Sequence, residues 1–358
     1  MSFDLETGFE SLTVGRLVMI FVGFGFIALA IRKKWEPLEL LPIGAGMVLA
    51  NLPLTGLTAP PGSGEGMGSA GLLGIILEYG LYSFMLLPQL IFFCIGAMTD
   101  FGPLIANPKA FFLGAAAQVG IFGAFLLAVV FGFSVEEAAA IGIVGGADGP
   151  TTIYVSGVLA PEILGVTSTA AYSYMAMVAL IQPPIIKLLT TRKERRVRMK
   201  PTARRVSRGE RILFSIVTPV AIILLIPKSA PLVGLLFLGN LFRESGVVER
   251  LTVTAQNELA NIITILLMLG VGASLPADRV MDPRTLIVLG LGFAAFAVST
   301  ATGLLMGKVM RLVSAEPFNP MIGAAGVSAV PMSARVVHHV GQKADKKNRS
   351  EERRVGKE

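Results

Sequence analysis

The residues best suited to chemistry form a short motif, Gly145-Gly146-Ala147-Asp148-Gly149-Pro150-Thr151-Thr152, inside an apolar stretch. Asp148 is the only acid of that stretch, and a carboxylate at mid-bilayer is costly unless it is paired or binds a metal. Hard cations take oxygen ligands, so Asp148 with the hydroxyls of Thr151 and Thr152 suits Na⁺. The nearest alternative is that Asp148 binds a proton. The alternative without a transport function is that Asp148 forms a buried ion pair with a basic residue.

A second motif runs from Asn319 to Arg335 and contains no charge before Arg335. Asn319 and Ser328 offer neutral oxygens, whereas the planar guanidinium of Arg335 can bind a carboxylate. From spacing alone, Arg335 is equally well explained as a residue whose side chain extends to the membrane surface.

Both motifs must be positioned by interrupted helices. Glycines and Pro150 cannot continue a regular helix without loss of backbone hydrogen bonds, so we expect a helix break at Asp148. At membrane depth such backbone is tolerated only where it lines a cavity or is covered by protein, and transporters bind ions there. The expected broken segments are 136–160 and 317–340. The other apolar segments predict helices over 12–31, 38–53, 72–98, 110–131, 167–189, 212–226, 230–242, 258–274 and 285–310.

Composition places the chain in a lipid bilayer. Of 358 residues, 53% are hydrophobic and 15% are charged, and several apolar runs approach the roughly 20 residues that span a bilayer as helix. Cys94 is the only cysteine, which excludes an internal disulfide, and adjacent His338 and His339 cannot alone build a multi-histidine metal site. The net charge of +7 is concentrated between Arg192 and Arg211. We interpret this segment as a cytoplasmic loop rather than a nucleic-acid surface.

The two halves of the chain share a series of short matches in the same order, which predicts an internal repeat. The matches are Pro42 and Asn51 with Pro231 and Asn240, Ile95-Gly96-Ala97 with Val271-Gly272-Ala273, Asn107-Pro108-Lys109 with Asp282-Pro283-Arg284, and the two glycine-rich breaks. An odd number of crossings separates equivalent points if 136–160 re-enters, so we expect inverted repeats whose breaks meet near the midplane. Asp148 should then approach Asn319 and Ser328.

These observations predict an all-α polytopic membrane protein with two inverted-topology repeats. The expected division is 1–190 for the first repeat, 191–211 for the basic cytoplasmic loop and 212–348 for the second repeat. Acids precede the first span and Arg32-Lys33-Lys34 follow it, which predicts an external N-terminus. Residues 349–358 match the translation of a common sequencing adapter, so we expect them to be an artefact that replaces a last span.

Both motifs resemble the signature segments of the β subunit of the decarboxylase sodium pumps, and the likeness extends from about Leu38 to Asn348. The resemblance implies a translocase of the bacterial inner membrane that decarboxylates carboxybiotin and couples this to Na⁺ export and proton uptake. It further implies Na⁺-site roles for Asp148, Asn319 and Ser328. By the same resemblance, Tyr174 would take part in ion or proton handling, and Arg335 would contact carboxybiotin.

The sequence contains no Ala-Met-Lys-Met-like biotin attachment site, so biotin must come from a partner. The resemblance implies two partners, a carboxyltransferase and biotin-carrier α subunit and a small membrane γ subunit. It leaves open whether the chain forms homo-oligomers. The upstream substrate, which is oxaloacetate, methylmalonyl-CoA, glutaconyl-CoA or malonate in such pumps, is not specified by this chain. The alternative function is a secondary Na⁺/H⁺ antiporter or ion-coupled carboxylate transporter, which also uses inverted repeats around an acid. A purely structural scaffold leaves Asp148 and the paired breaks unexplained.

Overall fold

The computed structural model describes residues 7–63, 70–199, 204–277, 283–314, 317–327 and 330–345, and these ranges contain helices and no strand. Within them, five helical segments are long and apolar enough to span a membrane. They are Val14–Lys33, Pro108–Val130, Pro161–Leu189, Glu249–Ala273 and Pro283–Val313. A sixth candidate is the pair Leu72–Tyr82 and Leu86–Met98, which is bent by 65°. The chain is therefore a multi-pass membrane protein, as predicted.

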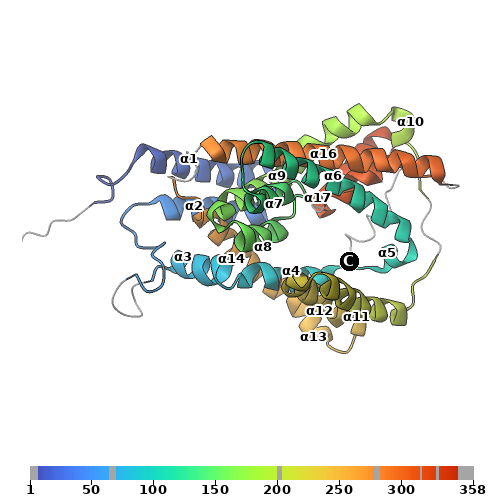
Figure 1. The fold of residues 1–358 in the computed structure, drawn as a ribbon, viewed down its shortest axis with the longest axis horizontal. Coiled ribbons are helices and arrows are strands. Elements are labelled where there is room, and N and C mark those ends of the chain that lie inside the picture. Colours follow the sequence, from blue (N-terminus) through green and yellow to red (C-terminus); the bar gives the residue numbers. More distant parts are fainter. Residues whose placement is uncertain are drawn as a thin grey trace, which may run out of the picture.

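The first half of the chain contains nine of the labelled helices, some of them extended by π-helical or 3₁₀ turns (Figure 1). They are α1 (Val14–Ala28), α2 (Pro37–Asn51), α3 (Leu72–Ile75), α4 (Leu86–Met98), α5 (Gly102–Ala106), α6 (Phe111–Val130), α7 (Val135–Val144), α8 (Gly149–Leu159) and α9 (Leu164–Leu189). The predicted span 72–98 is helical but divided, because a π-helical segment, Ile76–Tyr82, precedes a bend of 65° before α4.

The second half begins after the short α10 (Arg192–Arg195), in the basic loop. It comprises α11 (Arg208–Leu225), α12 (Ala230–Ser245), α13 (Glu249–Thr254), α14 (Ala260–Ala273), α16 (Pro283–Val313), the 3₁₀ segment Pro320–Gly326 and α17 (Val330–Ala344). The predicted helix 258–274 starts earlier, at Glu249, because a π-helical turn, Ala255–Leu259, joins α13 to α14 without a bend. The remaining predicted helices are confirmed to within a few residues.

Capping boxes start three of these helices. In α7, Ser134 Oγ accepts from the Glu137 amide at 3.1 Å, while the Glu137 carboxylate accepts from the Ser134 amide at 2.8 Å. Thr191 with Glu194 and Ser207 with Glu210 repeat the arrangement at α10 and α11. This pattern satisfies amide groups that a helix start leaves without partners, and so it fixes where each helix begins.

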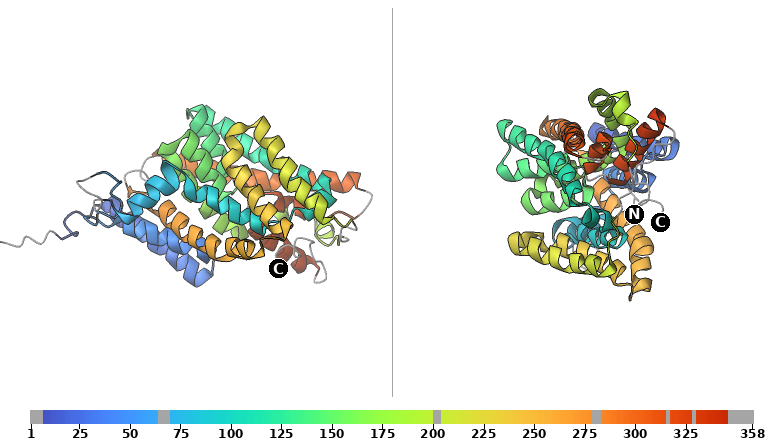
Figure 2. Two further views of the ribbon diagram at one scale, coloured as in Figure 1. Left: turned by 90° about the horizontal axis from the view of Figure 1, so that it is seen from below. Right: turned by 90° about the vertical axis from the view of Figure 1, so that its right-hand side faces the viewer.

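Helices of the two halves cross in pairs, α4 with α12 and α2 with α14. Glycine permits each crossing: a Cβ atom on Gly96 would lie 1.8 Å from the Leu236 carbonyl oxygen, and one on Gly272 would lie 2.1 Å from that of Ile43. Small residues of this kind let membrane helices approach to backbone contact. The pair α11 and α12 lies at one margin of the molecule, and α1 packs on α2 at another (Figure 2).

Two buried asparagines tie the crossings together. Asn51 in α2 donates to the Leu275 carbonyl just past α14 at 3.2 Å, and its side-chain oxygen accepts from the Ala277 amide. Asn240 in α12 donates to the Thr99 carbonyl just past α4 at 2.7 Å. Each asparagine therefore satisfies backbone groups at the helix end of the other half.

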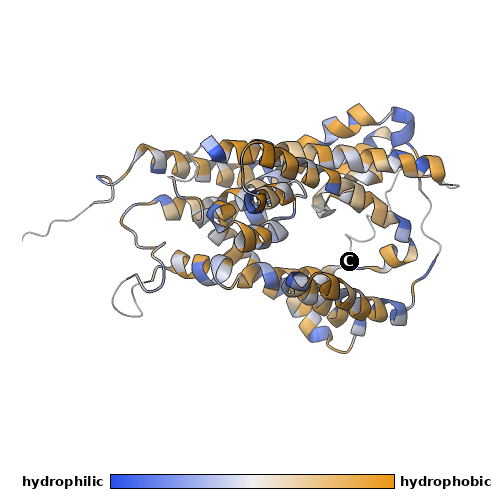
Figure 3. Cartoon of the chain, viewed as in Figure 1, coloured by the Kyte–Doolittle hydropathy of each residue, from blue (hydrophilic) through white to orange (hydrophobic). Residues whose placement is uncertain are grey.

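The two ends of the helix bundle differ in charge. At one end, Arg243 donates to the Met98 carbonyl, Arg204 to that of Ile105 and Arg196 to that of Ala344, while Arg311 pairs with Glu194 at 3.3 Å. We call this the basic end; it gathers the basic loop with the ends of α4, α16 and α17. At the opposite end, Arg284 lies 3.8 Å from Glu137. Apolar residues cover most of the helices between the ends (Figure 3).

Candidate functional site

The first break lies where the sequence predicts it. α7 ends at Val144, and α8 begins at Gly149. Between them, the Ala147 amide donates to the Val144 carbonyl at 2.9 Å, which closes the last turn of α7. Ala147 has a φ of 49°, a left-handed conformation that is uncommon for residues with a side chain. Such conformations persist where the surroundings over-determine them, and Ala147 is fully buried.

Asp148 is the N-cap of α8 and is brought together with both predicted threonines. Its carboxylate accepts from the Thr151 amide at 3.2 Å and from the Thr151 hydroxyl at 2.6 Å, and its backbone carbonyl accepts from the Thr152 hydroxyl at 2.7 Å. The amide groups and the dipole of the helix N-terminus favour a negative charge here.

No basic residue of the described ranges forms an ion pair with Asp148. The structural alternative, a buried ion pair, therefore has no partner in the part of the chain that the structure describes. The same ranges contain no group of three His, Cys, Asp or Glu side chains that could hold a metal ion. A single carboxylate with hydroxyl neighbours suits a monovalent cation rather than a transition metal.

Tyr172 lies directly against this break. A Cβ atom on Gly149 would lie 2.1 Å from the Tyr172 ring and 2.6 Å from its hydroxyl, so only glycine fits beneath the ring. Tyr172 is 1% exposed, and its hydroxyl has no hydrogen-bond partner in the described structure. Its electrostatic neighbours are Glu39 and Asp148.

Tyr174, the tyrosine singled out by the sequence, faces another helix. Its hydroxyl donates to the Leu289 carbonyl of α16, and its ring meets Phe293 edge to face. Residues two apart on a helix point about 200° apart, so the two tyrosines cannot face the same side. The sequence shows both hydroxyls but cannot say which of them faces Asp148.

The second break is built differently. The first break is preceded by an α-helix, whereas the second is preceded by the 3₁₀ segment Pro320–Gly326. The helix α17 then begins at Val330. Asn319 caps this segment by accepting from the Met321 amide at 3.1 Å, and it donates to the Val197 carbonyl of the basic loop at 2.8 Å. Ser328 lies outside the described residues.

Gln182 donates hydrogen bonds to both sides of the second break, and it was not among the site residues predicted from the sequence. It is fully buried in α9, and its amide nitrogen donates to the Ala324 carbonyl at 3.1 Å and to the Ser333 hydroxyl at 3.0 Å. One side chain therefore holds both arms of the break. The signal was a glutamine inside the otherwise apolar run 175–186, where a polar side chain is costly.

The two breaks adjoin through their apolar residues, because Ala147 belongs to the same buried cluster as Met321 and Val327. Gly145 packs on Ala295 of α16, and Pro320 packs on Gly307 of the same helix. The Asp148 carboxylate accepts hydrogen bonds from Thr151, and the Asn319 side chain forms its hydrogen bonds with Met321 and Val197. That the Asp148 and Asn319 side chains meet stays a prediction.

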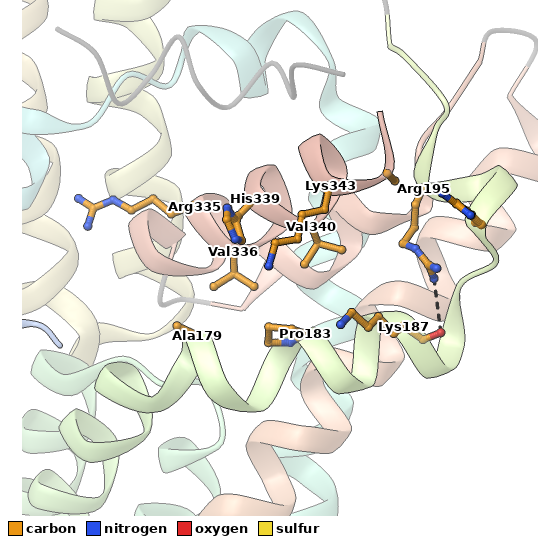
Figure 4. A pocket seen from close by; sticks show the side chains of 11 residues that line it. Ala179, Pro183, Lys187, Arg195, Arg335, Val336, His339, Val340 and Lys343 are labelled. Atoms are coloured by element: carbon orange, nitrogen blue, oxygen red, sulfur yellow. Dashed lines mark hydrogen bonds between the residues drawn. The ribbon is translucent and has the colours of Figure 1, made fainter. Parts of the chain in front are cut away.

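A pocket of about 770 Å³ opens between α9, α10 and α17 at the basic end. We call it the basic pocket; its charged lining residues are Lys187, Arg192, Arg195, Arg335 and Lys343. The Arg335 side chain points away from the other labelled basic side chains (Figure 4). Its electrostatic neighbour is Glu36, at the start of α2. The basic lining of the pocket therefore favours an anion, while the Arg335 guanidinium points away from the other basic side chains.

Comparisons with known proteins agree on one family. The family described as "Na+-transporting oxaloacetate decarboxylase beta subunit" matches residues 15–351. The chain is 49% identical to the methylmalonyl-CoA decarboxylase subunit beta of Propionigenium modestum, over 97% of this chain and 91% of the relative. It is 49% identical to the glutaconyl-CoA decarboxylase subunit beta of Acidaminococcus fermentans, with 96% and 88% covered. It is 48% identical to the oxaloacetate decarboxylase beta chain of Klebsiella pneumoniae, with 95% and 90% covered.

Proposed function

The chain belongs to the family of β subunits of Na⁺-transporting decarboxylases, and we propose that it decarboxylates carboxybiotin and couples this reaction to Na⁺ export and proton uptake. The observation that carries the proposal is the first break, where the carboxylate of Asp148 lies at a helix start and forms no ion pair with any described residue. Because the relatives are decarboxylase subunits, the antiporter or transporter alternative is not favoured.

Na⁺ binding is assigned to the oxygens of the first break. Asp148 supplies the negative charge, and Thr151 and Thr152 supply hydroxyl oxygens within hydrogen-bonding distance of it. Asn319 and Ser328 supply neutral oxygens from the second break. Tyr174 would act on ion or proton handling from the α16 side. Cations favour such oxygen sets, in which only one ligand is charged.

The decarboxylation step is assigned to Arg335. A guanidinium can hold the carboxylate of carboxybiotin by two parallel hydrogen bonds. The bond between the biotin nitrogen and the carboxylate carbon then breaks, carbon dioxide leaves, and the nitrogen takes a proton. Arg335 is one of the residues that line the basic pocket, and the charge of this pocket would draw the anionic carboxybiotin to this end of the molecule.

The membrane orientation follows from the charges of the two ends. Cytoplasmic loops carry an excess of Lys and Arg, so the basic end is cytoplasmic and the N-terminus is external. The crossings of α4 with α12 and of α2 with α14, with their matching asparagines, support two inverted repeats. We place the protein in the bacterial inner membrane. Its partners are a carboxyltransferase and biotin-carrier α subunit, and a small membrane γ subunit.

The test is reconstitution of the complete complex in lipid vesicles. Addition of the acid or acyl-CoA that loads the biotin should drive radioactive Na⁺ across the membrane, and Na⁺ but not K⁺ should activate decarboxylation. Na⁺ movement that follows an imposed pH gradient and needs no biotin would instead identify an antiporter. Decarboxylation without any response to Na⁺ would contradict the coupling.

A further inference from the structure

The segment 190–198, which follows α9 and contains α10, lies against the second broken segment. We call it the strap. Local hydrogen bonds fix its shape: the Glu194 carboxylate accepts from the Thr191 amide at 2.6 Å and from the Thr191 hydroxyl at 2.9 Å. Arg195 donates to the Lys187 carbonyl of α9 at 3.4 Å, as the dashed line in Figure 4 shows. The strap is therefore an ordered extension of α9.

One contact of the strap reaches the start of the second broken segment. The Val197 carbonyl accepts from the Asn319 side chain at 2.8 Å. Asn319 is 5% exposed, and its side-chain oxygen accepts from the Met321 amide at 3.1 Å, so both ends of its amide group are held. A shift of Val197 would therefore turn the side chain whose oxygen the proposed function assigns to Na⁺.

Two further contacts of the strap reach the end of α17. Arg196 donates to the Ala344 carbonyl at 3.0 Å, and Arg198 lies 2.7 Å from the Asp345 carboxylate. Arg196 and Arg198 flank Val197 in the chain. A movement of the strap relative to α17 is therefore a movement of the residue that holds Asn319.

The strap also forms one wall of the basic pocket. Arg192 and Arg195 line the pocket from the strap, and Arg335 and Lys343 line it from α17. Among the described residues that line it, none is an Asp or a Glu. Because the cations of the two walls repel each other, an anion bound between them would draw the strap and α17 together.

We propose that the strap couples the two ligands: an anion in the basic pocket draws the strap toward α17, and the Val197 carbonyl transmits this movement to Asn319. Arg196 and Arg198 are then positioning residues, because they touch neither ligand. The inference rests on the proposed function, which places carboxybiotin at the basic end and Asn319 in Na⁺ binding. Such coupling requires an element with two arrangements, between which each ligand discriminates.

The test compares Na⁺ transport with decarboxylation in the complete complex, reconstituted in lipid vesicles. Arg198→Gln removes the ion pair with Asp345 and leaves the residues that line the pocket unchanged. We expect carbon dioxide release at saturating Na⁺ to stay within about twofold of the wild type. The amount of radioactive Na⁺ transported per carbon dioxide should fall by about twofold to fivefold, the range expected from loss of an exposed ion pair.

Arg204→Gln is the matched control. Arg204 forms an ion pair of 2.9 Å with Glu210 at the same end of the molecule, and its side chain is 53% exposed, against 55% for Arg198. Its contacts, Glu210 and the Ile105 carbonyl, lie outside the basic pocket and both broken segments. This variant should keep the wild-type ratio, and exchange of the charges in Arg198→Asp with Asp345→Arg should restore it.

A wild-type ratio in Arg198→Gln would overturn the proposal. An equal fall of carbon dioxide release and Na⁺ transport would overturn it as well, because the ion pair would then only support the fold. If Arg198→Gln does not yield a monodisperse complex, Asp345→Asn tests the same ion pair. Absence of Na⁺ transport by the wild-type complex would instead contradict the proposed function, so the two failures are distinguishable.

Discussion

The two helix breaks lie against each other beside α16, yet they differ in secondary structure and in charge. The first consists of two α-helices joined at a carboxylate, and that carboxylate accepts hydrogen bonds from the second helix. The second consists of a neutral 3₁₀ segment and a helix, held by a glutamine from α9, with its positive charge further along at Arg335. Two adjoining helix breaks therefore differ in their chemistry.

This difference suggests a division of labour. A carboxylate at a helix N-terminus can exchange one cation for another with little movement, because its hydrogen bonds are local. A 3₁₀ segment has poorer hydrogen-bond geometry and so lends itself to rearrangement. We expect changes in the first break to act on ion binding, and changes in the second to act on stability and on use of the organic substrate.

The strongest test of the contrast is Asp148→Asn. The substitution keeps the N-cap but removes the only charge of the first break, and a neutral amide cannot replace a carboxylate as a cation ligand. We expect Na⁺-stimulated decarboxylation to fall by about a hundredfold or more, with normal membrane insertion. Decarboxylation assays at increasing Na⁺ measure this. A wild-type activation constant in the variant would mean that the charge of the first break is not the ion site.

Arg335→Ala and Asn319→Ala should separate the two ligands within the second break. Loss of the guanidinium should raise the KM for carboxybiotin by about tenfold to a hundredfold, as for other lost charged hydrogen bonds, with little change in apparent Na⁺ affinity. Asn319→Ala should do the reverse. Initial rates of decarboxylation are measured for both variants at increasing Na⁺ and at increasing carboxybiotin. Equal effects on both ligands would contradict separate roles for Arg335 and Asn319.

Gly323→Ala tests whether the second break is held by close packing. A Cβ atom there would lie 1.8 Å from the Gly303 carbonyl oxygen, which belongs to the backbone of α16 and cannot rotate away. Overpacking of this kind costs about 1–3 kcal/mol, so we expect a lower unfolding temperature in detergent. Gly123→Ala is the control, because a Cβ atom there meets nothing within 4 Å. Equal stability of the two variants would contradict the packing account.

The smallest effect is expected away from both breaks, at Glu194. Partial burial raises its pKa, but the hydrogen bonds from Thr191 and the charges of Lys308 and Arg311 outweigh this and lower the pKa from 4.5. The carboxylate therefore stabilises the fold above about pH 4.5, and this contribution is lost as the pH falls through the lower pKa of the folded state. Glu194→Gln should lower the unfolding temperature slightly at pH 7, and the difference should vanish in strong acid. A difference that persists there would point to packing.

Much of the fold could be predicted because hydrophobic length and helix-stop residues are local signals. The break at Asp148 follows from neighbouring glycines and Pro150, and the start of α7 follows from Ser134 and Glu137. The bend before α4 could not be predicted in this way. Its sequence contains no proline until Pro88, inside α4, and the π-helical segment that precedes it depends on tertiary packing.

The candidate site was less predictable, because side-chain direction depends on helix rotation. The sequence places Asp148, Thr151 and Thr152 within one turn, and the structure joins them. Tyr172 comes from the following long helix, α9, and no local pattern shows that its ring lies against Gly149 of the break. The predicted meeting of Asn319 with Asp148 depends on how the two breaks are turned toward each other, and it stays a prediction.

The paired asparagines have a consequence for biogenesis. Asn240, the side-chain partner of the Thr99 carbonyl, is synthesised 141 residues after Thr99. Asn51, the partner of the Leu275 carbonyl, is synthesised 224 residues before Leu275. At a synthesis rate of about 5–20 residues per second, the end of α4 lacks its partner for on the order of 7 to 30 s. The first half therefore enters the bilayer as an unfinished structure, and insertion of α12 completes it. Water or lipid headgroups can satisfy that carbonyl in the interval, and Asn240 then joins the two halves.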